Sequence, residues 1–242
     1  MFYAKTTAIL VVCACTASLQ AQPPQSKTVP LYNGKNFSGW YKYASDKKVN
    51  TEELISIDPF EKHIVIKGTS PGYLVTDNMY RDYELGFEWR WALSDRDKPQ
   101  AKVDEELKRQ SGILVHIISE GDSIWPKSIK AQLQAGRAGD LFVVSGFKFN
   151  VHPERKDPRD PLRALRSHDG VEKPLGEWNQ GTITCHGKFV SITINGTQVM
   201  AGRDAEYSRG RIALQSQAGE IHFRNITLKQ LEGKPVDPEK DN

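Results

Sequence analysis

The chain has 242 residues, with 33 basic and 30 acidic side chains and a formal net charge of +3. That length is enough for one large domain with a sizeable core. The basic residues are scattered and almost balanced by acidic ones, which excludes the broad positive field expected of a nucleic-acid-binding protein.

The N-terminal segment differs in kind from the rest. Lys5 precedes an apolar run from Ala8 to Ala17, then small residues, which is the layout of a secretory signal. We therefore predict a signal peptide over residues 1–21, a polar tether over 22–30, and a periplasmic or extracellular protein. Cys15 could instead carry a bacterial lipid anchor. The apolar run is too short to span a bilayer, and no later segment is apolar for long enough.

Two of the three cysteines lie in this predicted signal, so Cys185 is the only cysteine of the predicted mature chain. It cannot form an internal disulfide. Because it sits within a strand-like stretch, GTITCHG, we expect a small buried hydrophobic residue rather than a nucleophile.

Short runs that alternate apolar and polar residues follow one another along the chain, separated by Gly, Pro, Asn and Asp. They include KHIVIKG, GYLVTD, DYELGFEWRW, SGILVHII, SIKAQLQAG, DLFVVSGFKFNV, GRIALQSQ and EIHFRNITLKQL. Such runs are typical of strands. The Asn195-Gly196 pair between two of them predicts a hairpin. The pattern predicts an all-β sandwich or barrel, in a single domain over residues 31–231.

Two longer stretches interrupt the strands. Residues 94–110 are charged and mildly helical, and residues 152–178 form a long loop rich in Pro, Asp and Arg. A long ordered loop on a sandwich either rims a binding face or is a solvated excursion. Residues 232–242 are expected to be a disordered tail.

Polar side chains mark three of the strands. Glu84, Glu88 and Arg90 alternate with the aromatic residues of DYELGFEWRW, and the next two runs carry His116 and then Lys130, Gln132 and Gln134. If the three strands are neighbours in one sheet, these side chains form a single patch. The alternative is an ordinary solvated face of an antiparallel sheet. The six histidines are dispersed and show no metal-ligand spacing, so no transition-metal site is predicted.

Six stretches together resemble one family, the 3-keto-disaccharide hydrolase domain. They are LYNGKNFSGW, GYLVTDNMYRDYELGFEWRW, SGILVHI, WPKSIKAQLQAGRAGDLFVV, GEWNQGTITCHGKFVSITINGTQV and GRIALQSQAGEIHFRNITLKQL, in the family's order. The resemblance implies a concanavalin A-like jelly-roll sandwich of two antiparallel sheets with a concave carbohydrate-binding face. It also implies export and a role in bacterial saccharide breakdown.

Carried over by motif, the resemblance places functional residues at Glu88, His116, Lys130 and Gln132. Lys130 is a departure, because related sequences usually carry a glutamate there. A lysine can replace that glutamate only in another role, either stabilising an oxyanion or acting as a base with a strongly lowered pKa.

A 3-keto-glycoside can be cleaved without two opposed carboxylates, because the ketone acidifies the C2 proton and the C1 substituent leaves by elimination, followed by hydration. We expect Glu88 or His116 to act as base or acid, and Lys130 or Arg90 to stabilise the enolate. The residues expected to hold the sugar are Gln132, Gln134 and Trp125. The partner is then a saccharide or glycoside, with no nucleic acid, no cofactor and an unspecified oligomeric state. A divalent cation stays open.

Two other functions fit the same sequence. A non-catalytic lectin-like module would stack sugars on aromatic side chains, for which the candidates are Trp40, Tyr41, Trp125 and Trp178. An endo-glucanase would need a close pair of carboxylates. Glu84 and Glu88 would lie about 13 Å apart at ~3.3 Å per residue, too far for a retaining pair at about 5.5 Å.

Overall fold

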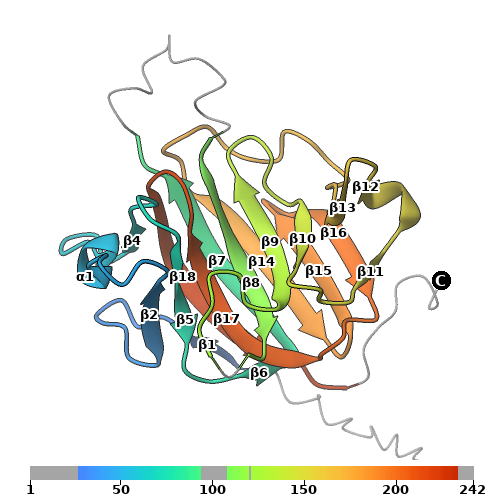
Figure 1. Ribbon diagram of the computed structural model, residues 1–242, viewed down its shortest axis with the longest axis horizontal. Coiled ribbons are helices and arrows are strands. Elements are labelled where there is room, and N and C mark those ends of the chain that lie inside the picture. The colour runs from blue at the N-terminus through green and yellow to red at the C-terminus, as the bar shows by residue number, and fades with distance from the viewer. Residues whose placement is uncertain (1–26, 94–107, 120, 234–242) are drawn as a thin grey trace, which may run out of the picture.

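The computed structural model describes residues 27–93, 108–119 and 121–233. Two antiparallel sheets pack face to face (Figure 1). The only helices of these ranges are the single-turn α1 (Thr51–Leu54) and the 3-10 turn η2 (Pro153–Arg155). The prediction of an all-β sandwich of two antiparallel sheets is confirmed.

The first sheet, sheet A, has the strand order β11-β16-β15-β14-β7-β18-β4-β3, with β1 beside β18. Its strands are β1 (Thr28–Pro30), β3 (Ile55–Ile57), β4 (Ile64–Ile66), β7 (Tyr83–Trp91), β11 (Asn150–Val151), β14 (Asn179–His186), β15 (Phe189–Ile194), β16 (Thr197–Arg203) and β18 (Ile221–Gln230). The Asn195-Gly196 turn joins β15 to β16, as the sequence predicts.

The second sheet, sheet B, has the order β12-β13-β10-β9-β8-β17-β5-β2, with β6 beside β17. Its strands are β2 (Trp40–Ala44), β5 (Gly72–Thr76), β6 (Tyr80–Arg81), β8 (Gln110–Ile117), β9 (Ser128–Gln134), β10 (Leu141–Val144), β12 (Lys156–Asp157), β13 (Asp160–Ala164) and β17 (Arg209–Ser216). Strands β12 and β13 belong to the long loop 152–178, which thus extends one edge of this sheet.

The core lies between the sheets and follows the alternation of the strands. In β7 every second residue, from Tyr83 to Trp91, is buried, and the residues between them are partly exposed. Ile113 and Val115 of β8 face this layer from sheet B. Each such large side chain contributes about 1.5–3 kcal/mol by leaving water. Cys185 is buried in the same core, as predicted, and burial raises its pKa to about 12.

The three polar strands do not lie in one sheet, so the condition under which their side chains would form a single patch is not met. β7 is in sheet A, between β14 and β18, whereas β8 and β9 are neighbours in sheet B. The chain crosses from one sheet to the other after Trp91. Alternation shows which residues of a strand share a face, but it is the same in either sheet. The polar sides of β7 and β9 therefore point away from each other, on opposite outer faces of the sandwich.

A bulge at the end of β8 changes the direction of His116. Leu114 pairs with Ala213 and Ile117 with Arg211, so Val115 and His116 both lie opposite Ile212. His116 accordingly has a positive φ of 59°. Its ring lies 6.3 Å from that of Phe147, a core residue. Burial lowers the pKa of His116 to about 4. The histidine is thus a core residue and not part of the outer face.

Several predicted segments fall at or beyond the limits of the described residues. Residues 28–30, which the sequence analysis places in the tether, form β1 and pair with β18. The predicted signal peptide (1–21), nearly all of the charged link (94–107) and residues 234–242 of the predicted tail lie outside the described residues. In the described part of the chain, no helix is long and apolar enough to cross a membrane.

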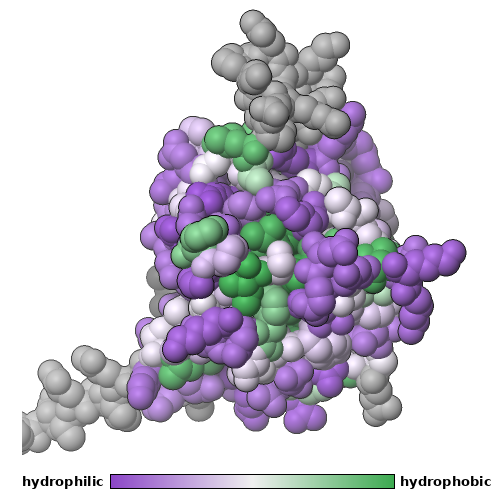
Figure 2. All heavy atoms as spheres, turned by 90° about the vertical axis from the view of Figure 1, so that its left-hand side faces the viewer, coloured by the Kyte–Doolittle hydropathy of each residue, from purple (hydrophilic) through white to green (hydrophobic). Residues whose placement is uncertain are grey.

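The helix α1 closes the end of the sandwich near β2 and β4. The Asn50 side chain caps it by accepting a hydrogen bond from the Glu52 amide at 3.0 Å, and Leu54 is buried beneath it. Seen from this side, the surface is mostly hydrophilic, with an apolar patch near its centre (Figure 2). No residue proposed from the sequence as functional lies on α1.

Candidate functional site

A cavity of about 440 Å³ opens on the outer face of sheet B, the face turned away from sheet A. Cross-strand partners in the sheet share a face, so Gly112 and Leu114 of β8 lie beside Gln132 and Lys130 of β9. The residues that line the cavity are Gln110, Trp125, Lys130, Gln132, Phe142, Val143, Val144, Ser145, Asp160, Leu162 and Gln217. We call this cavity the lysine pocket.

Lys130 lies at the centre of the lysine pocket and is only 5% exposed. Its ammonium nitrogen, Nζ, donates a hydrogen bond to Gln217 Oε1 at 3.0 Å, and Gln217 Nε2 in turn donates to Gln110 Oε1 at 2.8 Å. The rings of Trp125 and Phe142 have their centres 5.8 and 5.7 Å from Nζ. Among the described residues no carboxylate pairs with it, and burial lowers the pKa of Lys130 to about 7. The neutral amine is therefore accessible near neutral pH, unlike that of an exposed lysine.

Gly112 makes room for this lysine. A Cβ at Gly112 would lie 2.6 Å from Lys130 Cε and 2.8 Å from the backbone oxygen of Ala131. Both distances are shorter than van der Waals contact, so any other residue would push the lysine stem off the strand. The glycine thus allows the aliphatic stem of Lys130 to lie across β8.

Gln132 provides a hydrogen-bond acceptor beside the amine. Its side chain is 3% exposed, and its Oε1 atom has no hydrogen-bond partner among the described residues. An unsatisfied buried acceptor costs about 1–3 kcal/mol. A hydroxyl group bound in the lysine pocket can donate to this oxygen, which suits a sugar.

The long loop 152–178 supplies one wall of the lysine pocket, through Asp160 and Leu162 of β13. Arg163 of the same strand donates from Nε to the fully buried Asp140 at 3.1 Å, and Arg166 Nη1 donates to the other oxygen of Asp140 at 3.1 Å. Two arginines on one buried carboxylate fix the strand in place. Of the two alternatives left open by the sequence, the loop therefore rims the pocket.

The connection between β8 and β9 is tied to strands β2 and β5 on the same outer face of sheet B. The hydroxyl groups of Tyr41 and Tyr73 both donate to Asp122 Oδ1, at 2.9 and 3.0 Å. The rings of Tyr43 and Tyr73 stack with centroids 4.8 Å apart. This anchoring lies on the connection that leads to Trp125, which is 40% exposed and lines the lysine pocket.

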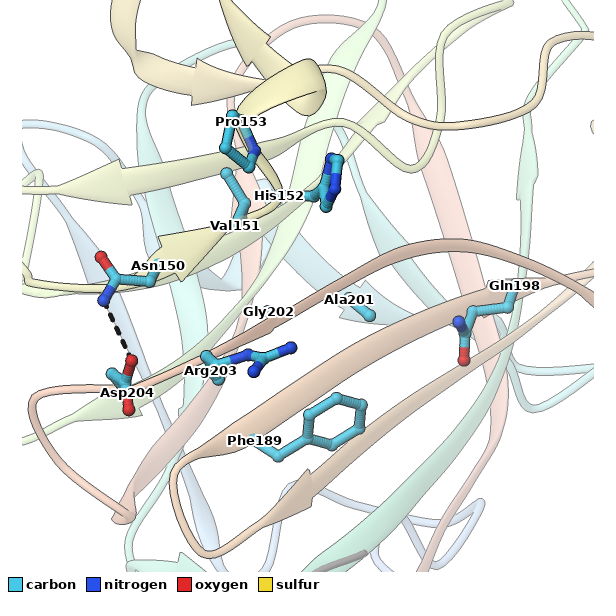
Figure 3. A pocket seen from close by; sticks show the side chains of 10 residues that line it. All are labelled: Asn150, Val151, His152, Pro153, Phe189, Gln198, Ala201, Gly202, Arg203 and Asp204. Carbon is cyan, nitrogen blue, oxygen red and sulfur yellow. Dashed lines mark hydrogen bonds between the residues drawn. The ribbon is translucent and has the colours of Figure 1, made fainter. Parts of the chain in front are cut away.

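A second cavity, of about 400 Å³, lies at the edge of sheet A between β11, β15 and β16 (Figure 3). Phe189, Gln198 and Arg203 line it, and Asn150 Nδ2 donates to Asp204 Oδ2 at 3.0 Å beside it. None of the residues predicted from the sequence lies there, and the cavity contains no buried titratable group. We therefore place the candidate site at the lysine pocket.

Glu172, in the loop 152–178, also has an altered acidity. Burial raises the pKa of this carboxyl to about 7, against the opposing effect of a hydrogen bond from the Ala138 amide at 3.0 Å. It lines a separate cavity with Trp91 and ties the loop to the turn after β9. Its place is outside the lysine pocket.

Comparison with known protein families identifies the chain. The model of one family, described as the 3-keto-alpha-glucoside-1,2-lyase-like domain, matches residues 27–229. The chain belongs to this family. It is accordingly a glycosyl hydrolase-like, carbohydrate-active protein. No curated protein matches it in sequence.

Solved structures share the fold at low sequence identity. A "putative glycosyl hydrolase" from Parabacteroides distasonis is 18% identical, with a TM-score of 0.59 over 85% of this chain and 94% of that one. The β-glucanase of Bacillus licheniformis is 10% identical, with a TM-score of 0.55 over 87% and 100%. The carbohydrate-binding module CBM66 from Bacillus subtilis is 8% identical, with a TM-score of 0.51 over 79% and 96%. The fold is thus the concanavalin A-like jelly roll that the family resemblance implies.

The structure brings some of the predicted site residues together and separates others. Lys130, Gln132 and Trp125 line the lysine pocket. Gln134 is on the same face of β9, next to Gln110 in register, but it does not line the pocket. His116 is turned into the core by the bulge.

Glu88 and Arg90 lie on the outer face of sheet A, so the prediction that they join Lys130 is wrong. Glu88 accepts hydrogen bonds from Arg224 Nε at 2.7 Å and from Asn225 Nδ2 at 3.1 Å. The guanidinium groups of Arg90 and Arg224 lie 4.5 and 4.0 Å from the ring centre of Trp178. The charged side of β7 thus forms a surface network with Trp178.

Sequence reasoning missed several residues of the lysine pocket. The spacing of Gln110 and Gln217 would have revealed them, since Gln110 begins β8 in QSGIL and Gln217 directly follows β17 in ALQSQ, each in phase with the outward-facing residues of that strand. Phe142 and Asp160 gave no such signal. Of the four proposed aromatic platforms, Trp40 is a core residue and Trp178 covers sheet A. Tyr41 is tied to Asp122 and does not line the lysine pocket, whereas Trp125 does.

We expect Glu88→Gln to leave turnover of a 3-keto-glucoside within about twofold, because its side chain is on the far face of the sandwich. The Glu88–Arg224 pair is 18% and 39% exposed, so its loss should cost no more than about 1 kcal/mol. Initial rates and a thermal melt test both points. A tenfold loss of rate in a fully folded variant would show that Glu88 takes part in the reaction after all.

Proposed function

We propose that this protein cleaves 3-keto-glycosides at the lysine pocket. The observation that carries the proposal is Lys130, a buried amine without a carboxylate partner among the described residues, beside amide groups and an exposed tryptophan. Family membership supports the substrate class, and the pocket lies on the outer face of sheet B.

The reaction makes three chemical demands. The negative charge that develops at the C3 oxygen must be accommodated, the C2 proton must be removed, and the departing C1 oxygen needs a proton. Among the residues that line the lysine pocket, Lys130 and Asp160 have an amine and a carboxyl side chain. In our proposal Lys130 acts at the ketone and Asp160 carries the protons. Gln132 and Gln217 hold sugar hydroxyls, and the ring of Trp125 stacks on the sugar.

The pKa of Lys130 makes the rate dependent on pH. Because its pKa is lowered to about 7, the neutral amine increases as the pH rises through 7. If the neutral amine is the active form, kcat/KM should rise between about pH 6 and 8 and then level off. An ammonium that only donates a hydrogen bond to the enolate would give a rate that falls over the same range. Initial rates measured from pH 5.5 to 9, at constant ionic strength and with the substrate well below KM, decide between the two.

The direct test uses paired substrates. The purified protein is incubated with the α- and β-anomers of a 3-keto-glucoside and with their unoxidised parents, and the products are followed by mass spectrometry. We expect release of the aglycone from a keto substrate only. Release from the unoxidised parents would identify an ordinary glycosidase.

A second candidate function is the lectin-like module. The partly exposed ring of Trp125 beside the amides of Gln132 and Gln217 is a suitable sugar-binding surface without any chemistry. Binding of glycans by calorimetry, with no product from any keto substrate, would favour this function over cleavage.

We also propose that the protein acts outside the cytoplasm, on the layout of residues 1–21 alone. Intact mass of the protein recovered from its native host tests this. Cleavage after Ala21 supports a signal peptide, a mass that includes a lipid at Cys15 supports an anchor, and the uncleaved chain contradicts both.

A further inference from the structure

The surroundings of Lys130 are those of a nucleophile more than of an ion-pairing cation. Its nitrogen has one hydrogen bond, to the neutral amide oxygen of Gln217, and two aromatic rings within 6 Å. A lysine that is desolvated in an apolar pocket has a reactive neutral amine, which is the form that attacks carbonyl groups. Burial lowers the pKa of Lys130 to about 7, so that form is abundant at neutral pH.

We propose that Lys130 acts covalently, and that its Nζ atom forms an iminium with C3 of the 3-keto sugar. This inference rests on the proposed function, because it needs a ketone substrate in the lysine pocket. It gives the lysine a role that a carboxylate at the same position could not have.

The covalent bond forms in two steps. The Nζ lone pair attacks C3, and the electron pair of the C=O bond moves to oxygen, which takes a proton to give a carbinolamine. The nitrogen lone pair then expels this hydroxyl group, protonated to water, and leaves the iminium. One water is released, and no oxidant or reductant takes part.

Elimination and release follow from the iminium. Loss of the C2 proton to the Asp160 carboxylate gives an enamine. The enamine electron pair expels the C1 oxygen, which recovers the proton from Asp160, and the sugar becomes a conjugated iminium. One water then adds at C1, with a proton returning to C2, and a second water hydrolyses the iminium. The net change is the addition of one water across the glycosidic bond.

The walls of the lysine pocket favour this route over a non-covalent one. The iminium carries the same single positive charge as a Lys130 ammonium, and losing the C2 proton from it gives an uncharged enamine, whereas losing that proton from a free ketone gives an enolate anion. A buried site penalises charged species. Since Lys130 is 5% exposed and flanked by Trp125 and Phe142, the neutral intermediate is the one that this pocket best accommodates.

Reductive trapping tests the inference. The full chain is incubated at pH 7 with a 3-keto-glucoside and sodium cyanoborohydride, which reduces iminium ions far faster than ketones. Intact mass and peptide mapping then locate the adduct. We expect a sugar adduct on Lys130 with at least tenfold higher occupancy than on any other lysine, and a loss of activity that follows the occupancy. The unoxidised parent glycoside should give no adduct.

Two lysine variants serve as matched controls. Lys130→Arg keeps a cation but cannot form an iminium, so both the adduct and turnover should be lost. Lys127→Arg, three residues earlier and paired with Glu206 at 2.6 Å, should keep both. Thermal melts test whether each variant is folded. The trapping result on the unchanged chain does not depend on either variant.

The possible outcomes separate the two proposals. If the unchanged chain turns over the keto substrate without an adduct on Lys130, the covalent inference is overturned and the proposed function stands. Turnover retained in Lys130→Arg would likewise overturn the covalent inference and leave the proposed function standing. If no keto substrate is converted at all, the proposed function fails and the covalent inference fails with it.

Discussion

Replacing Lys130 with methionine is expected to lower kcat for a 3-keto-glucoside by roughly a hundredfold or more, the usual effect of removing a group that takes part in proton transfer or covalent chemistry. Methionine is also unbranched and fills most of the volume of the lysine stem, so the pocket should hold its shape. Steady-state kinetics measure the effect. A variant with the turnover of the unchanged chain would remove Lys130 from the reaction.

The same substitution should stabilise the fold, because a buried amine without a carboxylate partner is costly. We expect a gain of the order of 1–4 kcal/mol in the free energy of unfolding at neutral pH. The pKa of Lys130 is about 7 in the folded state and 10.5 for an unperturbed lysine. The unfolded chain therefore binds more protons between these values, and the stability of the unchanged protein rises with pH there. The gain from methionine should be largest below about pH 7 and shrink towards pH 10.5.

Asp140→Asn is expected to cost about 3–5 kcal/mol of stability, as breaking a buried ion pair from one side does. Asp140 has no exposed surface, and the side chains of Arg163 and Arg166 that it binds are only 16% and 13% exposed. An asparagine keeps the shape but removes the one carboxylate that both guanidinium groups share. Among the described residues, this leaves Arg163 only with Asp157 at 3.4 Å and Arg166 only with the exposed Asp169. Chemical denaturation measures the loss.

Asp169→Asn is the matched control for that change. Asp169 pairs with Arg166 at 2.5 Å, but its side chain is 85% exposed, so its removal should cost well under 1 kcal/mol. A loss below about 1 kcal/mol in Asp140→Asn as well would contradict the role we give to the buried network. Because that network holds the β13 wall, Asp140→Asn should also raise KM for a keto substrate.

Local pattern was enough to predict the fold class and the core. The alternation in β7 identified its buried aromatic side correctly, and Asn195-Gly196 marked a real hairpin. The assignment of strands to sheets could not be read in this way. An alternating strand looks the same in sheet A and sheet B, and only the path of the chain after Trp91 decides between them.

The candidate site could be predicted only where its residues are close together in the sequence. Lys130, Gln132 and Trp125 were found because they are close in sequence and belong to one strand and the connection before it. His116 was misplaced because its bulge is visible only when β8 is paired with β17 and Ile212 is seen to face two residues. Asp160 was missed because its strand, β13, is held at the pocket by the ion pair between Asp140 and Arg163, which are 23 residues apart in the sequence.

The close approach of Gly112 to Lys130 has a consequence for redesign. Lys130 depends on the glycine opposite it, since a Cβ at Gly112 would occupy the space of the lysine stem. Transferring the amine to another scaffold therefore requires a glycine opposite it as well as the lysine itself. A single exchange at the lysine position, made against a bulkier neighbour, would place the amine elsewhere and give a misleading negative result.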